Sequence, residues 1–485
     1  MSRPGPDTHK VSLGATLYPR RPIWHDGAMS DTIRLGYHEG TLIVSGAAPA
    51  VLEALPGVRS DPRTKEHRAE GRAYRSLIEH LRANGLTYSD QARQWGVTPW
   101  PLRISRDPFA HQREAVDTWW QQGGRGVVVL PTGTGKTFVA MLAMNRVSRP
   151  TLVVTPTIDL MTQWYRELGI AFDVPIGLMG GGYHDLQPLT VTTYDSARIH
   201  VEKWANRYGF VVFDEAHHLP SASNALAAIG ALAPFRLGLT ATPERADGQE
   251  VQLDHLIGPV VYRREITELT GQFLANYRTE RLYVELTPEE AAEYQQAREH
   301  YRQFCSERGF SLGGANGLRR FILESTRSRE GRAAFESFQR QRQLALAAPA
   351  KLHLLEQLLD RFCQDRVIVF THDNATVYEI SRRFLVPAIT HQTKTKERKH
   401  ILEGFLTGLY TTIVTSRVLN EGVDVPAANV GIVLSGTSTV AEHVQRLGRL
   451  LRKHGEKQAL LIEVVSRGTV EEFSSARRRQ HQAYQ

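Results

Sequence analysis

The hydrophobic residues of the chain fall into short β-branched runs that are separated by segments of helix length. The first set contains GVVVLP (126–131), TLVVTP (151–156), LTVTTY (189–194), FVVFDE (210–215) and RLGLTA (236–241). The second set contains RVIVFT (366–371), YTTIVTS (410–416), NVGIVLS (429–435) and ALLIEVV (459–465). Runs that are apolar on both faces and alternate with helices are typical of parallel strands buried between helices. The pattern therefore predicts an α/β fold with two parallel-sheet lobes.

A helical pattern without such runs lies between the two sets, over residues 287–357. Thr287 followed by Glu290 has the spacing of a capping box at a helix start. The apolar positions then recur every three or four residues, at Ala291, Tyr294, Ala297 and Tyr301. Segment 319–342 carries seven arginines against three glutamates. We expect a helical insertion with one basic face, although a solvated helix surface presents the same composition.

The first hundred residues predict a small α+β domain. TLIVSG (41–46) is typical of a strand, and EGRAYRSLIEHLRANG (70–85) of a helix that ends at a glycine. Pro99 and Pro101 indicate a linker. The expected domains are an N-terminal domain (1–100), a first lobe (101–265), a helical insertion (266–350) and a second lobe (351–485).

Composition adds modest constraints. A chain of 485 residues has room for about three domains. It has no apolar run near the roughly 20 residues that cross a bilayer, and no secretory signal is expected. Its two cysteines, Cys305 and Cys363, are expected to be reduced, in a cytoplasmic protein. A net charge of +8 favours a polyanionic partner such as nucleic acid, but many basic proteins bind none.

A glycine-rich turn, PTGTGKT (131–137), lies between an expected strand and an expected helix. Main-chain N–H groups at such a turn can cradle phosphates, helped by the helix dipole. The turn contains Thr132, Gly133, Thr134 and Gly135. Lys136 can reach the outer phosphates, and the Thr137 hydroxyl can bind Mg²⁺. Leu130 stands where the strict pattern has glycine, and a chance glycine-rich turn is the alternative interpretation.

The segment GFVVFDEAHHLP ends an apolar strand with two adjacent carboxylates, Asp214 and Glu215. They either reach solvent at the strand end or lie beside a cation, because burying both without compensation is costly. With the phosphate loop present, we expect Asp214 to hold Mg²⁺ opposite Thr137. Glu215 would then activate the attacking water. The adjacent His217 and His218 also allow a zinc site, but the phosphate loop favours magnesium.

These motifs, with DEAH (214–217), LTATP (239–243) and QRLGRLLR (445–452), resemble those of superfamily 2 helicases over residues 105–470. The resemblance implies two RecA-like lobes with ATP and Mg²⁺ in the cleft between them. It implies adenine recognition by Gln112, ribose contact by Asp424, and coupling of hydrolysis through His217, Thr240, Thr242 and Gln445. It also assigns two arginine fingers, Arg449 and Arg452, to the second lobe, where an exposed basic helix face is the alternative. Cations placed in advance suit the charge of a transferring phosphoryl group.

Finer features are similar to the XPB-type helicases, in particular the compact archaeal and bacterial forms. The shared segments are RLGLTATPERADG, PAITHQT, VLNEGVDVPAANVG and SRGTVEEFSSARRR. In that family the insertion is a thumb-like element, and the N-terminal domain recognises damaged DNA. One departure concerns the family's Arg-Glu-Asp triplet, which here is Arg245, Ala246 and Asp247. The missing carboxylate puts in doubt how strongly the chain separates strands.

The resemblance also implies a path for DNA at the ends of the strands. The residues that would line it are Pro156, Thr157, Thr193, Thr371, Thr415 and Ser416. Ligands gather at the carboxyl ends of parallel strands. Loop hydroxyls, however, often only cap helices.

By this resemblance the chain is expected to be a monomeric, ATP-dependent DNA helicase or translocase that moves 3′ to 5′ in DNA repair. A Bax-type nuclease is a possible partner. Two alternatives are an ATP-gated DNA scaffold that recruits a nuclease and unwinds little, and an RNA helicase. Strand displacement on a forked duplex distinguishes the scaffold, and ATPase stimulation by DNA against RNA distinguishes the RNA motor.

Overall fold

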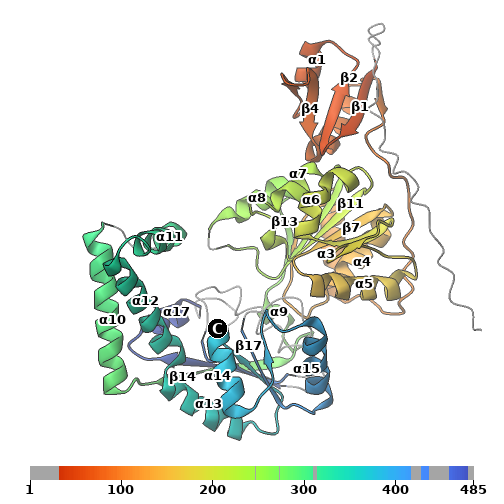
Figure 1. Ribbon diagram of the computed structural model, residues 1–485. Helices are drawn as coiled ribbons and strands as arrows, with labels where there is room; N and C mark the ends of the chain where they lie inside the picture. The colour runs from red at the N-terminus through yellow and green to blue at the C-terminus, as the bar shows by residue number, and fades with distance from the viewer. Residues whose placement is uncertain are drawn as a thin grey trace, which may run out of the picture.

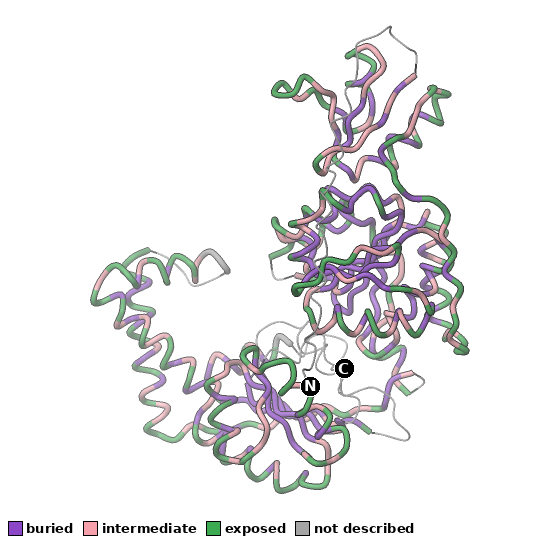
Figure 2. Tube along the Cα trace, turned by 45° about the vertical axis from the view of Figure 1, so that its right-hand side comes forward, coloured by how far each residue is buried: buried purple, intermediate pink, exposed green. Residues whose placement is uncertain are grey.

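The structure is a computed structural model. The part of the chain that it describes contains three β-sheets and a helical arm (Figure 1). The described residues are 32–245, 247–271, 273–309, 314–416, 428–435 and 458–478. Figure 1 shows the N-terminal domain beside the first lobe, and the arm projecting from the second lobe. In Figure 2 the buried residues concentrate along the strands of the two lobes, whereas the arm is largely exposed or half-buried.

The N-terminal domain has a five-stranded sheet in the order β3-β4-β2-β1-β5. Its elements are β1 (Ile33–His38), β2 (Thr41–Ser45), α1 (Pro49–Glu53), β3 (Arg59–Asp61), β4 (Glu66–Glu70), α2 (Tyr74–Ala83) and β5 (Tyr88–Asp90). The predicted strand and helix are both confirmed. Helix α2 begins four residues later than predicted because a 3₁₀ turn occupies Gly71–Ala73. Tyr74, Ile78 and Leu81 are buried on one face of α2, as the spacing predicts.

The first lobe has an eight-stranded sheet in the order β13-β6-β12-β11-β7-β10-β8-β9, parallel except at β9. Its strands are β6 (Arg125–Val129), β7 (Thr151–Thr155), β8 (Gly177–Gly180), β9 (Tyr183–His184), β10 (Leu189–Thr193), β11 (Phe210–Asp214), β12 (Phe235–Thr240) and β13 (Val260–Arg263). Its helices are α3 (Ala110–Gln121), α4 (Lys136–Val147), α5 (Ile158–Phe172), α6 (Tyr194–Trp204), α7 (Ala225–Gly230), α8 (Gln252–Leu256) and α9 (Ile266–Leu269). All five strands of the first predicted set are confirmed.

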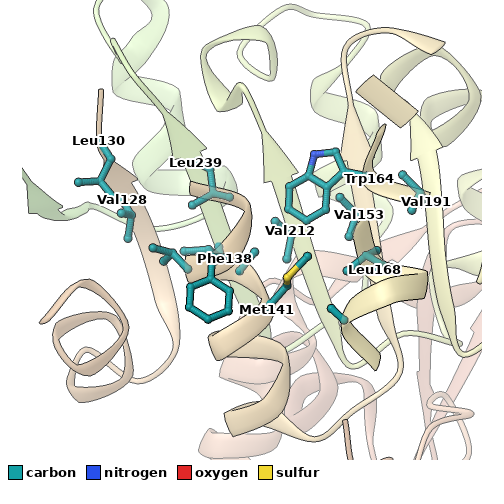
Figure 3. Close-up of a cluster of buried hydrophobic side chains, with 14 of the residues drawn as sticks. Val128, Leu130, Phe138, Met141, Val153, Trp164, Leu168, Val191, Val212 and Leu239 are labelled. Atoms are coloured by element: carbon teal, nitrogen blue, oxygen red, sulfur yellow. The ribbon is translucent and has the colours of Figure 1, made fainter. Parts of the chain in front are cut away.

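The core of the first lobe lies between this sheet and its helices. Figure 3 shows side chains of α4 and α5 packed on the strands, with Phe138 and Met141 from α4 and Trp164 and Leu168 from α5. The strand residues of this cluster, Val128, Val153, Val191, Val212 and Leu239, have no exposed surface. Apolar burial of this extent stabilises the sheet and its packing against the helices.

The second lobe has a parallel six-stranded sheet in the order β14-β19-β18-β15-β17-β16. Its strands are β14 (Asn276–Val284), β15 (Val367–Phe370), β16 (Ala388–Ile389), β17 (Thr412–Thr415), β18 (Val430–Val433) and β19 (Gln458–Ser466). Its helices are α13 (Pro349–Arg361), α14 (Asn374–Phe384), α15 (Thr395–Thr407) and α17 (Val470–Arg478). All four strands of the second predicted set are confirmed.

The arm consists of α10 (Pro288–Glu307), α11 (Gly314–Ser325) and α12 (Arg329–Ala347). The capping box is confirmed: Thr287 Oγ1 accepts from Glu290 N at 3.2 Å, and Glu290 Oε2 accepts from Thr287 N at 2.9 Å. Part of the basic face is neutralised, because Arg340 pairs with Glu293 at 2.6 Å.

The insertion begins later than expected. Strand β14 lies inside the range 266–350 assigned to the insertion, but it pairs with β19 along its whole length in the second-lobe sheet. The helical arm therefore starts at Pro288 and is inserted between β14 and α13. The strand escaped prediction because its sequence, NYRTERLYV, is polar over most of its first six residues and lies at the edge of the sheet, so it lacks a long apolar run.

Two further features concern covalent links and membranes. Cys305 and Cys363 are both free thiols, as expected. No helix within the described ranges combines the length and apolar character that a bilayer crossing requires.

Candidate functional site

The glycine-rich turn leads directly from β6 into α4. Gly133 and Gly135 both have positive φ, 89° and 85°, where glycine is favoured. A Cβ at Gly135 would lie 2.4 Å from Gln112 Nε2. Thr134 is buried, and its hydroxyl donates to Pro131 O at 2.7 Å. The turn is thus held in a defined conformation at the start of α4, where the free N–H groups of a helix N-terminus can bind phosphate.

Gln112 is fully buried against this turn. Its Nε2 donates to Thr134 O at 2.9 Å, and its Oε1 accepts from Phe109 N at 3.0 Å. His111 Nε2 lies 3.0 Å from the same carbonyl, and burial lowers the pKa of this imidazole. The structure therefore shows Gln112 holding the turn, and adenine recognition by this side chain stays a prediction.

Lys136 and Thr137 open helix α4 immediately after the turn. Lys136 Nζ donates to Leu130 O at 3.2 Å, and Thr137 is half-buried. Burial raises the pKa of the Asp214 carboxyl, and the Lys136 charge offsets part of this rise. The structure therefore brings the predicted phosphate-binding lysine and the predicted metal-binding carboxylate within electrostatic range of each other.

Asp214 ends β11 and is almost completely buried. Its Oδ2 accepts from Trp164 Nε1 at 2.7 Å, its Oδ1 from Glu215 N at 3.0 Å, and its main-chain carbonyl from Tyr194 Oη at 3.0 Å. Burial raises the pKa of the Asp214 carboxyl to about 7, and the Glu215 charge adds to this rise. The Trp164 N–H and the Lys136 charge oppose it in part. An added cation would favour the ionised carboxylate further.

The site fits a triphosphate with a divalent cation. Three buried oxygens, Thr132 Oγ1, Glu215 Oε2 and Thr242 Oγ1, lack hydrogen-bond partners among the described residues. Buried polar atoms of this kind are usually satisfied by a ligand, ion or water. Glu215 also has a positive φ of 45°, which is uncommon for a residue with a side chain. Hard cations such as Mg²⁺ bind one or two carboxylates together with substrate phosphates, which matches this donor set.

The zinc alternative finds no support in the described residues. They hold no group of three or more His, Cys, Asp or Glu side chains that could bind a metal ion. His217 is instead engaged with the neighbouring strand.

His217 and the two threonines after β12 form one hydrogen-bonded chain. His217 Nδ1 lies 3.0 Å from Thr240 Oγ1, which itself donates to Thr242 O at 3.0 Å. When Thr240 Oγ1 donates to Thr242 O, it accepts from His217 Nδ1, which requires the tautomer with the hydrogen on Nδ1. The predicted coupling residues of the first lobe therefore lie together, and a change at one can reach the others.

Arg245 joins this chain from the other side. It donates to His217 O, and its guanidinium pairs with both oxygens of Asp247 at 2.8 and 2.7 Å. This pairing lowers the pKa of the Asp247 carboxyl to about 2. Ala246 between them lies outside the described residues.

The predicted DNA contacts of the first lobe stand at helix starts. Thr157 Oγ1 accepts from Leu160 N at 3.2 Å and caps α5, and Thr193 Oγ1 accepts from Ser196 N at 3.3 Å and caps α6. Pro156, half-buried, precedes the first cap. These hydroxyls therefore have partners within the protein, which agrees with the capping alternative, and contact with DNA stays a prediction.

The predicted DNA contacts of the second lobe are more deeply buried. Thr371 and Thr415 have no exposed surface, and their hydroxyls donate to Asp373 O and Ile389 O at 2.9 Å. Ser416 Oγ donates to Asn374 Oδ1 at 2.8 Å. A phosphate near these strand ends would therefore meet main-chain groups before the Thr371 and Thr415 side chains.

The two lobes touch near the first-lobe DNA contacts. Asp159, in the first turn of α5, forms an ion pair with Arg398 of α15. Four predicted second-lobe residues of the nucleotide site lie outside the described residues, namely Asp424, Gln445, Arg449 and Arg452. Their roles stay predictions.

Two candidate groups escaped sequence interpretation. The Arg106 guanidinium lies over the rings of Phe109 and Phe138, with distances to the ring centroids of 5.4 and 4.9 Å, beside the glycine-rich turn. Phe109 also contacts Phe273, with ring centroids 4.9 Å apart. No local motif announces this cluster, because its members come from separate segments.

The second group is the run Gly180–Gly182, in which every residue has positive φ. A Cβ at Gly180 would lie 3.2 Å from Thr193 Oγ1, and one at Gly181 would lie 3.3 Å from Ile158. The run thus approaches the starts of both α5 and α6. Three consecutive glycines were the available sequence signal.

Three family models match the chain. They are described as "Xeroderma pigmentosum group B helicase damage recognition domain" at residues 35–92, "Type III restriction enzyme, res subunit" at 106–245, and "Helicase conserved C-terminal domain" at 350–454. The matches follow one another along the chain in the order of the three sheets.

Similarity to curated proteins decides the family. The chain is 37% identical over 451 residues to "DNA 3'-5' translocase XPB2" of Sulfurisphaera tokodaii, covering 92% of this chain and 100% of that protein. The chain belongs to the XPB family of superfamily 2 helicases. It is also 29% identical to "DNA 3'-5' helicase XPB" of Mycobacterium tuberculosis and to "Putative DNA 3'-5' helicase Rad25" of Halobacterium salinarum. The match to the M. tuberculosis protein covers 76% of this chain and 62% of that relative. The match to the H. salinarum protein covers 79% of this chain and 58% of that relative.

Solved structures confirm the predicted fold class of two RecA-like lobes. The Hef helicase domain of Pyrococcus furiosus aligns with a TM-score of 0.50 and 18% identity, over 76% of this chain and 97% of that one. Dbp5 of S. cerevisiae, bound to RNA and ADP BeF3, aligns with a TM-score of 0.54 and 13% identity, over 79% and 89%. Whether the DEAH string places this XPB-family chain in a DEAH-box subgroup stays a prediction.

Proposed function

We propose that this chain is an ATP-dependent DNA helicase and translocase that moves 3′ to 5′ and acts in DNA repair. The observation that carries the proposal is the full-length match to an archaeal DNA 3'-5' translocase. A phosphate-binding turn and a buried carboxylate at the end of β11 add physical support. Both features belong to the first lobe, and the proposed turnover also needs residues of the second lobe.

The first-lobe residues have separable tasks in this proposal. The main-chain N–H groups of residues 132–137 hold the phosphates, and Lys136 turns from Leu130 O toward the outer phosphates. Thr137 and Asp214 would hold Mg²⁺, which supplies positive charge to the phosphate oxygens. Glu215 would accept a proton from the attacking water through its Oε2, which lies 3.6 Å from His217 Nδ1 and has no hydrogen-bond partner among the described residues.

The second lobe completes the site when the lobes close. Gln445, Arg449 and Arg452 would then face the phosphates, so that hydrolysis depends on the position of the lobes. Opening after release would shift the DNA contacts of one lobe relative to those of the other. Cyclic closure of this kind converts hydrolysis into movement along a strand.

A weaker unwinding activity is favoured by one sequence feature. Ala246 replaces the glutamate of the family's Arg-Glu-Asp triplet. An ATP-gated DNA scaffold with a Bax-type nuclease partner is therefore the second candidate. DNA-stimulated ATP turnover without strand displacement on a forked duplex would favour it.

A monomeric state and a cytoplasmic location are further parts of the main proposal.

The first test is DNA-stimulated ATP hydrolysis in a Lys136→Ala variant. We expect turnover to fall by about 100-fold or more, because the variant lacks the cation that faces the outer phosphates. Lys203→Ala is the matched control, since Lys203 is an exposed residue of α6. DNA should stimulate the wild-type protein more than RNA of the same sequence does. Equal turnover in the two lysine variants would exclude the assigned role of Lys136.

A further inference from the structure

Asp214 is held by two aromatic side chains from different helices. The Trp164 indole of α5 donates to its carboxylate, and the Tyr194 hydroxyl of α6 donates to its main-chain carbonyl. Trp164 lies fifty residues from Asp214 in the chain. In Figure 3 the indole packs beside Val153 and Val212 of the sheet, with its nitrogen turned away from Met141.

The indole fixes the direction of one carboxylate oxygen. Trp164 is 1% exposed, and the sheet residues around it have no exposed surface, so the ring has little freedom to move. An indole N–H can only donate, and it therefore requires an acceptor oxygen at Asp214 Oδ2. A buried donor at 2.7 Å in an apolar shell is a strong orienting contact. The remaining lone pairs of the carboxylate then point in a defined direction.

The same two helices begin at the predicted DNA contacts. Thr157 caps α5 and Thr193 caps α6, so each helix starts at a predicted DNA contact and reaches Asp214 with an aromatic side chain. Trp164 lies about two helical turns beyond Thr157, along a continuous hydrogen-bonded helix. Helix α5 also carries Asp159, the residue that contacts the second lobe. A displacement of α5 would move the Trp164 indole relative to Asp214, because Trp164 is part of that helix.

We propose that Trp164 and Tyr194 are positioning residues that make the geometry of Asp214, and through it Mg²⁺-dependent nucleotide binding, depend on DNA bound at the starts of α5 and α6. This inference rests on the proposed function. In this proposal both residues act through Asp214 and not on the nucleotide itself. Their effect reaches the reaction through the orientation of one carboxylate, as the hydrogen-bond partners of metal ligands generally do.

The decisive variant is Trp164→Phe, which retains an aromatic ring and removes the N–H. We expect the nucleotide affinity measured with Mg²⁺ to fall by about 10-fold, the lower end of what losing such a partner costs. The affinity measured in EDTA should not change. The stimulation of ATP turnover by DNA should also fall several-fold relative to turnover without DNA. Fluorescence polarisation of a labelled ATP analogue measures the first effect independently of turnover.

The matched control is Trp119→Phe. Trp119 is equally buried in the first lobe, and its indole N–H donates to Arg236 O at 3.0 Å, away from the site. It should lose comparable thermal stability but keep the Mg²⁺ dependence of nucleotide binding and the DNA stimulation. The inference is overturned if the two tryptophan variants show the same Mg²⁺ dependence and the same stimulation.

Tyr194→Phe provides a second, smaller change. It removes only the hydroxyl that donates to Asp214 O. If Trp164→Phe does not fold, a normal Mg²⁺ dependence and a normal DNA stimulation in Tyr194→Phe overturn the inference, and a reduction of both supports it. Absence of DNA-stimulated turnover in the wild-type protein would contradict the proposed function itself, so the two failures are distinguishable.

Discussion

Replacement of Glu215 by glutamine is expected to abolish almost all ATP hydrolysis while nucleotide binding remains. The expected loss of turnover is about 10²- to 10⁴-fold, the contribution of a positioned general base. The side chain is only 13% exposed, and its Oε2 is buried without a hydrogen-bond partner among the described residues. Glutamine has the same shape as glutamate and adopts the same main-chain conformation equally well. It cannot, however, accept the proton of the attacking water.

Single-turnover hydrolysis in the presence of DNA, with nucleotide affinity measured separately, tests this expectation. Glu202→Gln is a suitable control, because Glu202 is an exposed glutamate of α6. An unchanged affinity with lost hydrolysis assigns Glu215 to the chemical step. Near-normal turnover in Glu215→Gln would remove it from that role.

The second large effect concerns stability. Lys351 of α13 is completely buried, and its ammonium donates to Leu434 O at 2.7 Å, Val464 O at 3.0 Å and Glu471 Oε2 at 2.5 Å. Lys351→Met should destabilise the second lobe by about 3–5 kcal/mol, because it leaves the Glu471 carboxylate buried without its cation. Urea unfolding monitored by circular dichroism measures this loss as an earlier transition.

The double variant Lys351→Met/Glu471→Leu separates the ion pair from simple packing. It should recover part of the lost stability, since the buried charge is removed together with its partner. A double variant less stable than Lys351→Met alone would contradict this account of the pair. Ser466 N also donates to Glu471 Oε2 at 2.9 Å, so recovery should be incomplete.

Much of the fold follows from local patterns in the sequence. Nine strand runs were visible because buried parallel strands are apolar on both faces, and α10 was announced by its capping box. Strand β14 was not visible, because this edge strand is polar over most of its first six residues and lacks a long apolar run. The strands β8, β9, β13 and β16, at or near the sheet edges, were missed because they are only two to four residues long.

Some residues of the candidate site could likewise be predicted from the sequence, and others could not. The glycine-rich turn, Asp214 and Glu215 could be found from spacing, since their chemistry depends on contiguous residues. The Trp164–Asp214 contact could not, because a tryptophan on an apolar helix face looks like an ordinary core residue. A sequence also does not show whether a threonine hydroxyl faces solvent or the protein interior. The burial of Thr371 and Thr415 therefore became evident only in the structure.

The most direct test of the central claim is displacement of a third strand from a DNA triplex by the wild-type protein, with Glu215→Gln as control. A motor that moves along DNA on ATP hydrolysis should displace the strand only with ATP and Mg²⁺, and Glu215→Gln should not displace it. Reversing the polarity of the loading strand should abolish the reaction if movement is 3′ to 5′. DNA-stimulated ATP hydrolysis with no displaced strand in either polarity would contradict the account.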